Sequence, residues 1–198
     1  MYKKIEGYSN YKKMFIVCVL TAFADGLFHP FLIAFLFDMG GMALMGSGLG
    51  ISMIADSFGA YFAGKLSDKY GRKPFLLISL IVSVFVFLAF PLIIIIEINL
   101  VIIISGIIIL LIISGLTSGM WDTVEAIYLG DITHIAYRGR MMGTYWGASG
   151  IIFGFAMIGA GLLGVHIDFL LIAIVVALIY LVAIALLFKI KDIVNIQE

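Results

Sequence analysis

Residues 64–76 read GKLSDKYGRKPFL, a short charged stretch between two long apolar runs, at about 43–64 and 74–95. About 20 helical residues cross the roughly 30 Å hydrocarbon core of a bilayer, and each run is long enough to do so. Pro74 stands at the start of the second run, where a helix loses nothing by lacking an N–H group. We therefore expect the charged stretch to be a loop between two membrane-spanning helices.

The composition of the chain indicates that its solvent is lipid. Hydrophobic residues make up 64% of the 198 residues and charged residues 12%, against roughly 45–50% and 25% in soluble domains. A soluble fold of this length could not cover so much apolar surface. The formal net charge is zero, which argues against nucleic acid as a partner.

The apolar segments predict an all-α integral membrane protein in which residues 1–198 form a single six-helix bundle. The expected helices cover about 14–37, 43–64, 74–95, 99–129, 141–164 and 169–188. The first resembles a secretion signal, but its apolar run resumes after Asp25 and continues to Phe37, which is too long for a signal core. We interpret it as an uncleaved span. Cys18, the single cysteine, lies inside this run, so no internal disulfide can form.

The basic residues predict the orientation of the bundle, because all twelve fall on alternate loops and on the two ends of the chain. They are Lys3, Lys4, Lys12, Lys13, Lys65, Lys69, Arg72, Lys73, Arg138, Arg140, Lys189 and Lys191. The opposite loops carry only Asp38, Glu97 and Asp168. Basic loops stay in the cytoplasm, so we expect both termini there and the protein in the plasma membrane.

The distribution of glycine predicts which helices are peripheral. The segments at 74–95 and 169–188 contain no glycine. The segment at 141–164 is rich in it, with Gly143, Gly147, Gly150, Gly154, Gly159, Gly161 and Gly164. Small residues let helix backbones approach where lipid supplies no hydrophobic drive. We therefore expect 74–95 and 169–188 to face lipid, and the other segments to pack against protein or line a cavity.

The acids inside the predicted spans are Asp25, Asp56, Asp122 and Glu125. A charge at the bilayer centre costs about 2.5–3.5 kcal/mol on insertion scales, so such residues face a cavity or a partner. His29 lies one turn after Asp25 on the same helix face, and the adjacent Pro30 is expected to bend the helix. The Asp25–His29 pair suits proton coupling; the alternative is a structural pair that neutralises itself and bridges helices.

The other acids leave two interpretations each. Asp56 lies on the small-residue face of its segment, where a structural hydrogen bond and a substrate contact are equally open. Asp122 and Glu125, at i and i+3, can share a proton or hold a cation. In the alternative, Glu125 is interfacial and pairs with a loop arginine. Candidate pocket aromatics, most of which would serve only in packing, are Phe23, Phe28, Trp121, Tyr145 and Trp146.

The stretch at 64–76 resembles the loop between helices 2 and 3 of major facilitator superfamily transporters, whose pattern is roughly G-x-L-a-D-r-x-G-r-k-x-x-l. The matching residues are Gly64, Asp68, Gly71, Arg72 and Lys73. The later stretch around Asp131 and Arg138 is similar to the family's second cytoplasmic loop. The resemblance implies that Arg72 pairs with Asp131, and that Asp68 caps a helix in the other half of the transporter. These contacts would hold a cytoplasmic gate shut.

The resemblance extends over nearly the whole chain and implies its function. Family members usually have twelve spans in two halves, each made of two inverted three-helix repeats, and helices 1 and 4 line the transport path. This chain resembles the N-terminal half. It is expected to be a half-size secondary transporter subunit that moves a small-molecule substrate by alternating access, coupled to protons. Its partners would be membrane lipid and a second six-helix half, either itself in a homodimer or another half. No cofactor, metal or enzymatic activity is expected.

Other classes compete with this interpretation. A truncated or non-transporting membrane module, or a channel, would also have this composition. A six-span intramembrane serine protease is suggested by the G-x-S-G string at 147–150, but the segment at 169–188 offers no histidine as base for Ser149. The family's helix-4 arginine is absent, with apolar residues near Leu110 in its place, and 141–164 lacks the antiporter Gly-Pro. The substrate is therefore open.

Overall fold

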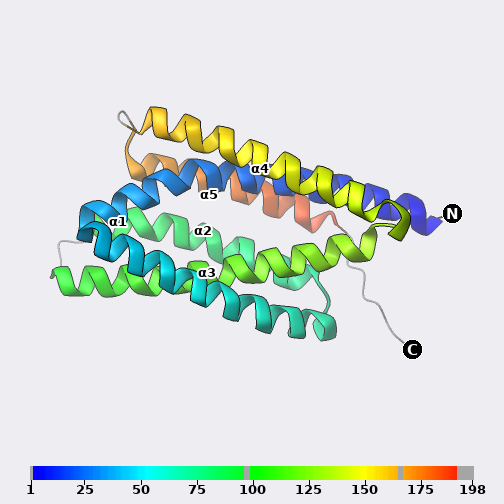
Figure 1. Cartoon of the computed structure of the whole chain (residues 1–198), viewed down its shortest axis with the longest axis horizontal. Coiled ribbons are helices and arrows are strands. Elements are labelled where there is room, and N and C mark those ends of the chain that lie inside the picture. Colours follow the sequence, from blue (N-terminus) through cyan, green and yellow to red (C-terminus); the bar gives the residue numbers. More distant parts are fainter. Residues whose placement is uncertain (1, 96–98, 165–166, 191–198) are drawn as a thin grey trace.

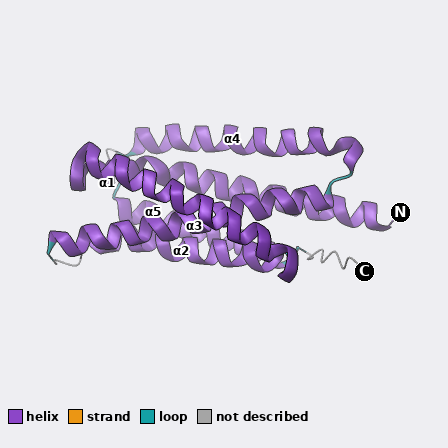
Figure 2. Cartoon of the chain, turned by 60° about the horizontal axis from the view of Figure 1, so that its bottom comes forward, coloured by secondary structure: helices purple, strands orange, loops and turns teal. Residues whose placement is uncertain are grey.

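The computed structural model describes residues 2–95, 99–164 and 167–190, and Figure 2 shows helix through nearly all of them. The elements are α1 (Tyr2–Tyr70), α2 (Lys73–Ile95), α3 (Leu100–Ile132), the 3₁₀ turn η1 (Ile135–Tyr137), α4 (Arg138–Leu163) and α5 (Phe169–Phe188). Five helices in the described ranges are long and apolar enough to cross a membrane. The all-α prediction is confirmed there, whereas Glu97 and Lys191 lie outside the described residues.

Helix α1 consists of two helices joined at a kink. Its 69 residues would extend about 100 Å if straight, over three times the bilayer core of about 30 Å. Gly40 and Gly41 leave the helical conformation, and the φ of +61° at Gly41 is one that only glycine adopts readily. Figure 1 shows the chain turning back there, so that the first arm of α1 (2–39) and its second arm (42–70) run in opposite directions.

The break in α1 does not fall at Pro30, where the sequence predicts a bend. The chain is helical on both sides of Pro30 and departs from helical dihedrals only at Gly40 and Gly41. Proline keeps a helical φ and removes a single backbone hydrogen bond, whereas a reversal needs dihedrals that the glycines supply. The glycine pair therefore separates the segments expected at 14–37 and 43–64.

The second arm of α1 packs against α3 so closely that glycine is required. A Cβ on Gly115 would collide with the carbonyl oxygen of Ser52, and one on Gly119 with that of Asp56. The missing side chains let the two backbones touch, which is how helices associate in lipid. Small-residue packing of these two segments is thereby confirmed.

Helix α4 uses only one side for packing within this chain. On that side the backbone of Phe153 lies against Gly26 of the first arm of α1. On the rest of α4, no atom of the described residues lies within 4 Å of where a Cβ would stand on Gly143, Gly147, Gly154, Gly159 and Gly161. Large side chains of the second arm of α1, such as Met53 and Phe58, are exposed as well. We call these α4 glycines and these second-arm side chains the open face.

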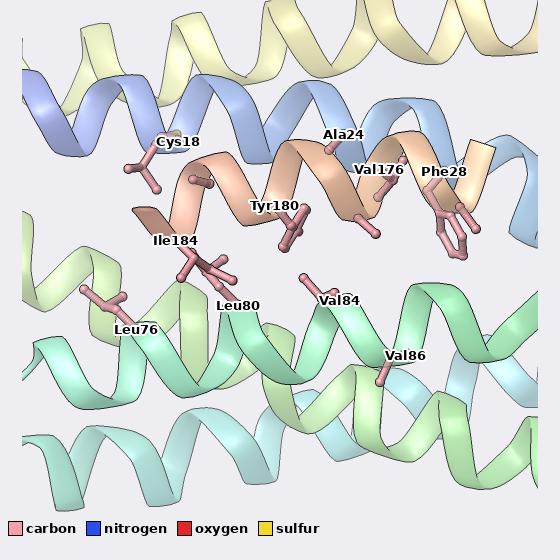
Figure 3. Packing of buried hydrophobic residues seen from close by; sticks show 14 of the residues in the cluster. Cys18, Ala24, Phe28, Leu76, Leu80, Val84, Val86, Val176, Tyr180 and Ile184 are labelled. Carbon is pink, nitrogen blue, oxygen red and sulfur yellow. The ribbon is translucent and has the colours of Figure 1, made fainter. Parts of the chain in front are cut away.

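Helices α2 and α5 pack against each other, and each also contacts a neighbouring helix. Figure 3 shows Ile184 of α5 beside Leu80 of α2 in this layer. On α5, Ala173 is fully buried, whereas Leu178 is exposed. The expectation that these two helices face lipid therefore applies to one face of each, because the other face completes the apolar core.

The α1–α2 and α3–α4 junctions, which carry basic residues, lie beside the end of α5 at one end of the bundle (Figure 1). The ammonium group of Lys13 donates to the carbonyl oxygen of Lys189 at 3.0 Å, and that of Lys73 donates to the carbonyl oxygen of Phe188 at 2.9 Å. These carbonyls end a helix and have no partner inside it, and the negative end of the helix dipole favours cations. Two lysines thus cap α5.

Candidate functional site

A cavity of about 510 Å³ opens between the helices, with wall residues from the first arm of α1 and from α2, α3, α4 and α5. Its ionisable wall residues include Asp25 and His29 of α1 together with Asp122 and Glu125 of α3. Small-molecule sites have volumes of about 300–1,000 Å³ and combine an apolar wall with a few polar groups. The cavity therefore brings four of the five predicted proton or substrate residues to one place.

Asp25 is held by a residue that the sequence analysis missed. The hydroxyl of Tyr180 donates a hydrogen bond of 2.6 Å to Asp25 Oδ1, and its ring packs edge-on against Phe87 at 5.0 Å between centroids. In the described structure His29 makes no hydrogen bond to Asp25, and its ring lies 6.1 Å from that of Phe153. The predicted Asp25–His29 pair is therefore wrong as a contact, because a tyrosine from α5 occupies the carboxylate.

The sequence held a signal for Tyr180. It is the only polar side chain in the α5 sequence, between Phe169 and Phe188. A tyrosine hydroxyl buried in an apolar layer almost always finds a partner. An intramembrane acid was therefore the partner to expect for the hydroxyl of Tyr180.

Glu125 is buried, with 1% of its surface exposed, and accepts a hydrogen bond of 2.6 Å at Oε1 from the hydroxyl of Tyr145. The bond links α3 to α4. It overturns the interpretation that Glu125 is interfacial and pairs with a loop arginine. Tyr145, expected as a pocket aromatic, is fully buried behind the cavity and does not form its wall.

Asp122 differs from the other two acids of the cavity. It is exposed to the cavity, and no hydrogen bond or ion pair to it occurs among the described residues. Trp121 and Trp146 lie in the same wall, as expected for pocket aromatics, and so does Phe28. Phe23, also expected there, lies outside the wall with 41% of its surface exposed.

Asp56 is not part of the cavity wall. It lies on the second arm of α1, and its backbone carbonyl packs against Gly119 of α3. The structure therefore places Asp56 at a helix–helix contact. A substrate contact of the Asp56 side chain stays a prediction.

The motif residues of the 64–76 stretch form a cluster at the basic end of the bundle. Arg72 Nη1 lies 2.6 Å from Asp68 Oδ1, and Arg72 Nε lies 3.3 Å from Asp131 Oδ2. Arg72 also donates to the hydroxyl of Ser67 at 2.9 Å. Gly71 ends α1 with a φ of +89°, which places it in the left-handed region that favours glycine. The contact between Arg72 and Asp131 implied by the resemblance is present.

The remaining motif residues surround this cluster. Arg138 donates to the carbonyl oxygen of Gly130 at 2.7 Å and so fastens the α3–α4 turn. Gly64 lies inside the second arm of α1. A Cβ placed on Gly64 would stand 3.5 Å from the side chain of Thr123 in α3. The side chain of Asp68 is 69% exposed. Among the described residues, the ion pair of Asp68 is with Arg72 of the same loop, and no other helix covers it.

Comparison with known families gives one result. Residues 14–195 match the family model described as Major Facilitator Superfamily. No curated protein matches the chain. The match covers all of the predicted spans, and the cavity and the motif cluster both lie inside it.

Proposed function

The chain belongs to the major facilitator superfamily and is an integral membrane secondary transporter, and from this premise we propose a more specific function. It moves a small solute by alternating access, coupled to protons, with the cavity as the solute site. Members of the family are transporters and not enzymes. The observation that carries the proposal is a cavity of about 510 Å³ in the membrane-spanning bundle, with Asp25, Asp122 and Glu125 in its wall.

Proton coupling is supported by the two tyrosine–carboxyl pairs. Asp25 and Glu125 each accept a hydrogen bond of 2.6 Å from a tyrosine hydroxyl, Tyr180 and Tyr145 respectively. A hydroxyl can donate to an ionised carboxylate or, after rotation, accept from a protonated carboxyl. Each pair can therefore keep its hydrogen bond while the acid takes up or releases a proton.

The proposed topology has six crossings. The two arms of α1 and helix α2 form one three-helix repeat, and α3, α4 and α5 form the inverted second repeat. Lys13, Arg72 and Lys73 lie at one end of the bundle. The positive-inside rule places that end, and with it both termini, in the cytoplasm. The plasma membrane is the proposed location.

A second six-helix half completes the proposed transporter, either a second copy of this chain or another half. The open face supports this, because exposed small residues are typical of helix–helix interfaces in membranes. Asp68 supports it too, since its carboxylate is 69% exposed and carboxylates are stabilised at helix N-termini. Two halves related by an axis along the membrane normal would bring such a helix from the partner to Asp68.

The test is uptake by the purified chain in liposomes, measured for a panel of labelled small solutes with and without a proton gradient. We expect uptake of at least one solute to rise with the gradient. Asp25→Asn should remove the response to the gradient but leave solute exchange, because exchange needs no net proton movement. Asp38→Asn removes an exposed carboxylate outside the cavity wall and serves as the matched control. Uptake insensitive to both the gradient and Asp25→Asn would contradict proton coupling. If the chain folds and forms a dimer but moves no solute, the alternative of a non-transporting membrane module would hold instead.

A further inference from the structure

We propose that the solute is a monovalent organic cation with N–H groups and an apolar body, anchored by Asp122 and enclosed by Trp121 and Trp146. The inference rests on the proposed function, because it names the chemical class of solute for the same cavity. Three properties of the cavity indicate an organic cation: its charge, its hydrogen-bonding groups and its aromatic surface.

The charge of the wall favours a cation over an anion. Three carboxyl groups line the cavity, and no lysine or arginine is among the described residues of its wall. Lys13 and Lys73 lie outside the wall and donate to backbone carbonyls at the end of α5. An anion in a site of low dielectric constant needs a paired positive charge. His29 is the one basic side chain among the described residues of the wall, and it is outnumbered by the three carboxyl groups. A cation meets a complementary charge there.

Four hydroxyl groups of the wall already donate their protons inside the protein. The hydroxyl of Thr21 donates its proton to the carbonyl oxygen of Cys18 at 3.1 Å, and Thr117 and Ser79 likewise donate within their own helices at 3.0 Å or less. Tyr180 donates to Asp25. A hydroxyl whose proton is engaged presents only oxygen lone pairs to a ligand. These four oxygens can therefore accept hydrogen bonds from a solute that brings its own N–H donors.

Asp122 is the acid that is available to such a donor. Asp25 and Glu125 already accept short hydrogen bonds from tyrosines. Asp122 faces the cavity and has no hydrogen-bond partner among the described residues. An ammonium group at Asp122 would form a charge-assisted hydrogen bond, which is about twice as strong as a neutral one. Asp122 is thus the anchor for the charged end of the solute.

The aromatic residues of the wall match the apolar body of the solute. Besides Trp121 and Trp146, the wall includes Phe28, Phe87 and Phe153. Tyr145 packs against Trp146 at 5.4 Å between ring centroids and supports the indole from behind. Aromatic faces attract cations through their ring quadrupoles. Within the described ranges, no three His, Cys, Asp or Glu side chains converge as metal ligands.

The experiment is equilibrium binding to the full chain in detergent, followed by tryptophan fluorescence and by calorimetry. The probes share one phenyl body and differ in their end group: 2-phenylethylammonium, 2-phenylethanol, 3-phenylpropanoate and the N-trimethylated ammonium. We expect the primary ammonium to bind most tightly and the carboxylate not to bind. Asp122→Asn should weaken ammonium binding by roughly ten- to a hundredfold, as expected for a hydrogen bond to a charged group. Asp38→Asn should leave it unchanged.

The ligand series uses the unaltered protein, so the inference can be tested even if Asp122→Asn fails to fold. Equal or tighter binding of the alcohol or the carboxylate overturns it. Equal binding of the trimethylated probe overturns the requirement for N–H groups. Trp146→Leu is a second variant, and undiminished ammonium binding to it overturns the aromatic enclosure. Ammonium binding without uptake in liposomes supports the cation site and counts against transport. Gradient-driven uptake of an anion supports transport and overturns the cation site.

Discussion

The contact between the second arm of α1 and α3 makes a sharp prediction for Gly119→Ala. In the structure a Cβ at this position would overlap the carbonyl oxygen of Asp56 and stand 3.0 Å from the amide nitrogen of Ala60. Both obstacles are backbone atoms, so no side chain can rotate away to make room. The two helices would have to separate, and the hydrogen-bonded backbone of the second arm would have to shift.

The size of the effect follows from two opposed contributions. Alanine is favoured over glycine inside a helix by about 0.8–1.0 kcal/mol. Overpacking of a close contact costs about 1–3 kcal/mol. Gly130→Ala is the matched control, because Gly130 lies in the same helix and has nothing within 4 Å of its Cβ position. Helix propensity cancels in the comparison, so Gly119→Ala should be less stable than Gly130→Ala by about 1–3 kcal/mol.

The assay is reversible unfolding of the purified protein from mild detergent into SDS, followed by tryptophan fluorescence. The free energy of unfolding is extrapolated to zero SDS for each variant. Equal free energies for Gly119→Ala and Gly130→Ala would refute the close packing of these helices. Such a result would also remove the argument that glycine is needed at this crossing.

Two further predictions concern the basic end of the bundle. The ion pair between Arg72 and Asp131 is partly exposed. A double-mutant cycle with Arg72→Gln and Asp131→Asn should therefore give a coupling energy of about 0.2–1 kcal/mol in the same unfolding assay. Zero coupling would mean that the pair does not form. Lys73→Met removes the hydrogen bond to the carbonyl oxygen of Phe188 and should lower stability by about 0.5–1.5 kcal/mol. Lys65→Met, at an exposed lysine of α1, is the control, and an equal loss there would contradict specific capping of α5.

The sequence predicted the architecture well because lipid leaves few alternatives. Backbone groups in a membrane must be satisfied within helices, so apolar length alone located the segments. Glycine content indicated that the second arm of α1 and α3 pack against protein, but it did not indicate that they pack against each other. The same reasoning placed the break in α1 between the segments at 14–37 and 43–64, where Gly40 and Gly41 lie, but it did not identify the glycines as its cause. A change of chain direction depends on the φ of Gly41, and this conformation is not encoded in apolar periodicity.

The site was predicted less completely than the fold. The sequence identified Asp25, Asp122 and Glu125 as unusual because an acid in an apolar segment is visible without any structure. Their partners come from other helices: Tyr180 is 155 residues from Asp25, and Tyr145 is 20 residues from Glu125. A single sequence contains local spacing, which favoured His29 as the partner of Asp25, but it contains no distances between helices.

The open face explains why this chain is expected to act with a second half. The glycines of α4 are spaced for helix packing, yet the described chain covers only one side of that helix. We therefore expect a dimer, or a complex with another half, when the chain is extracted into native-like lipid. A strictly monomeric particle that transports solute would contradict this expectation.

The most direct test of the central claim, that the cavity is an alternating-access solute site, is the accessibility of Ser118. This residue is exposed in the cavity wall. In a Cys18→Ala background, which removes the single native cysteine, Ser118→Cys is treated with a membrane-impermeant thiol reagent in sealed right-side-out and inside-out vesicles. An alternating-access transporter predicts labelling from both sides, slowed on both sides by a bound solute. Labelling from one side only, whatever solute is present, would contradict the account.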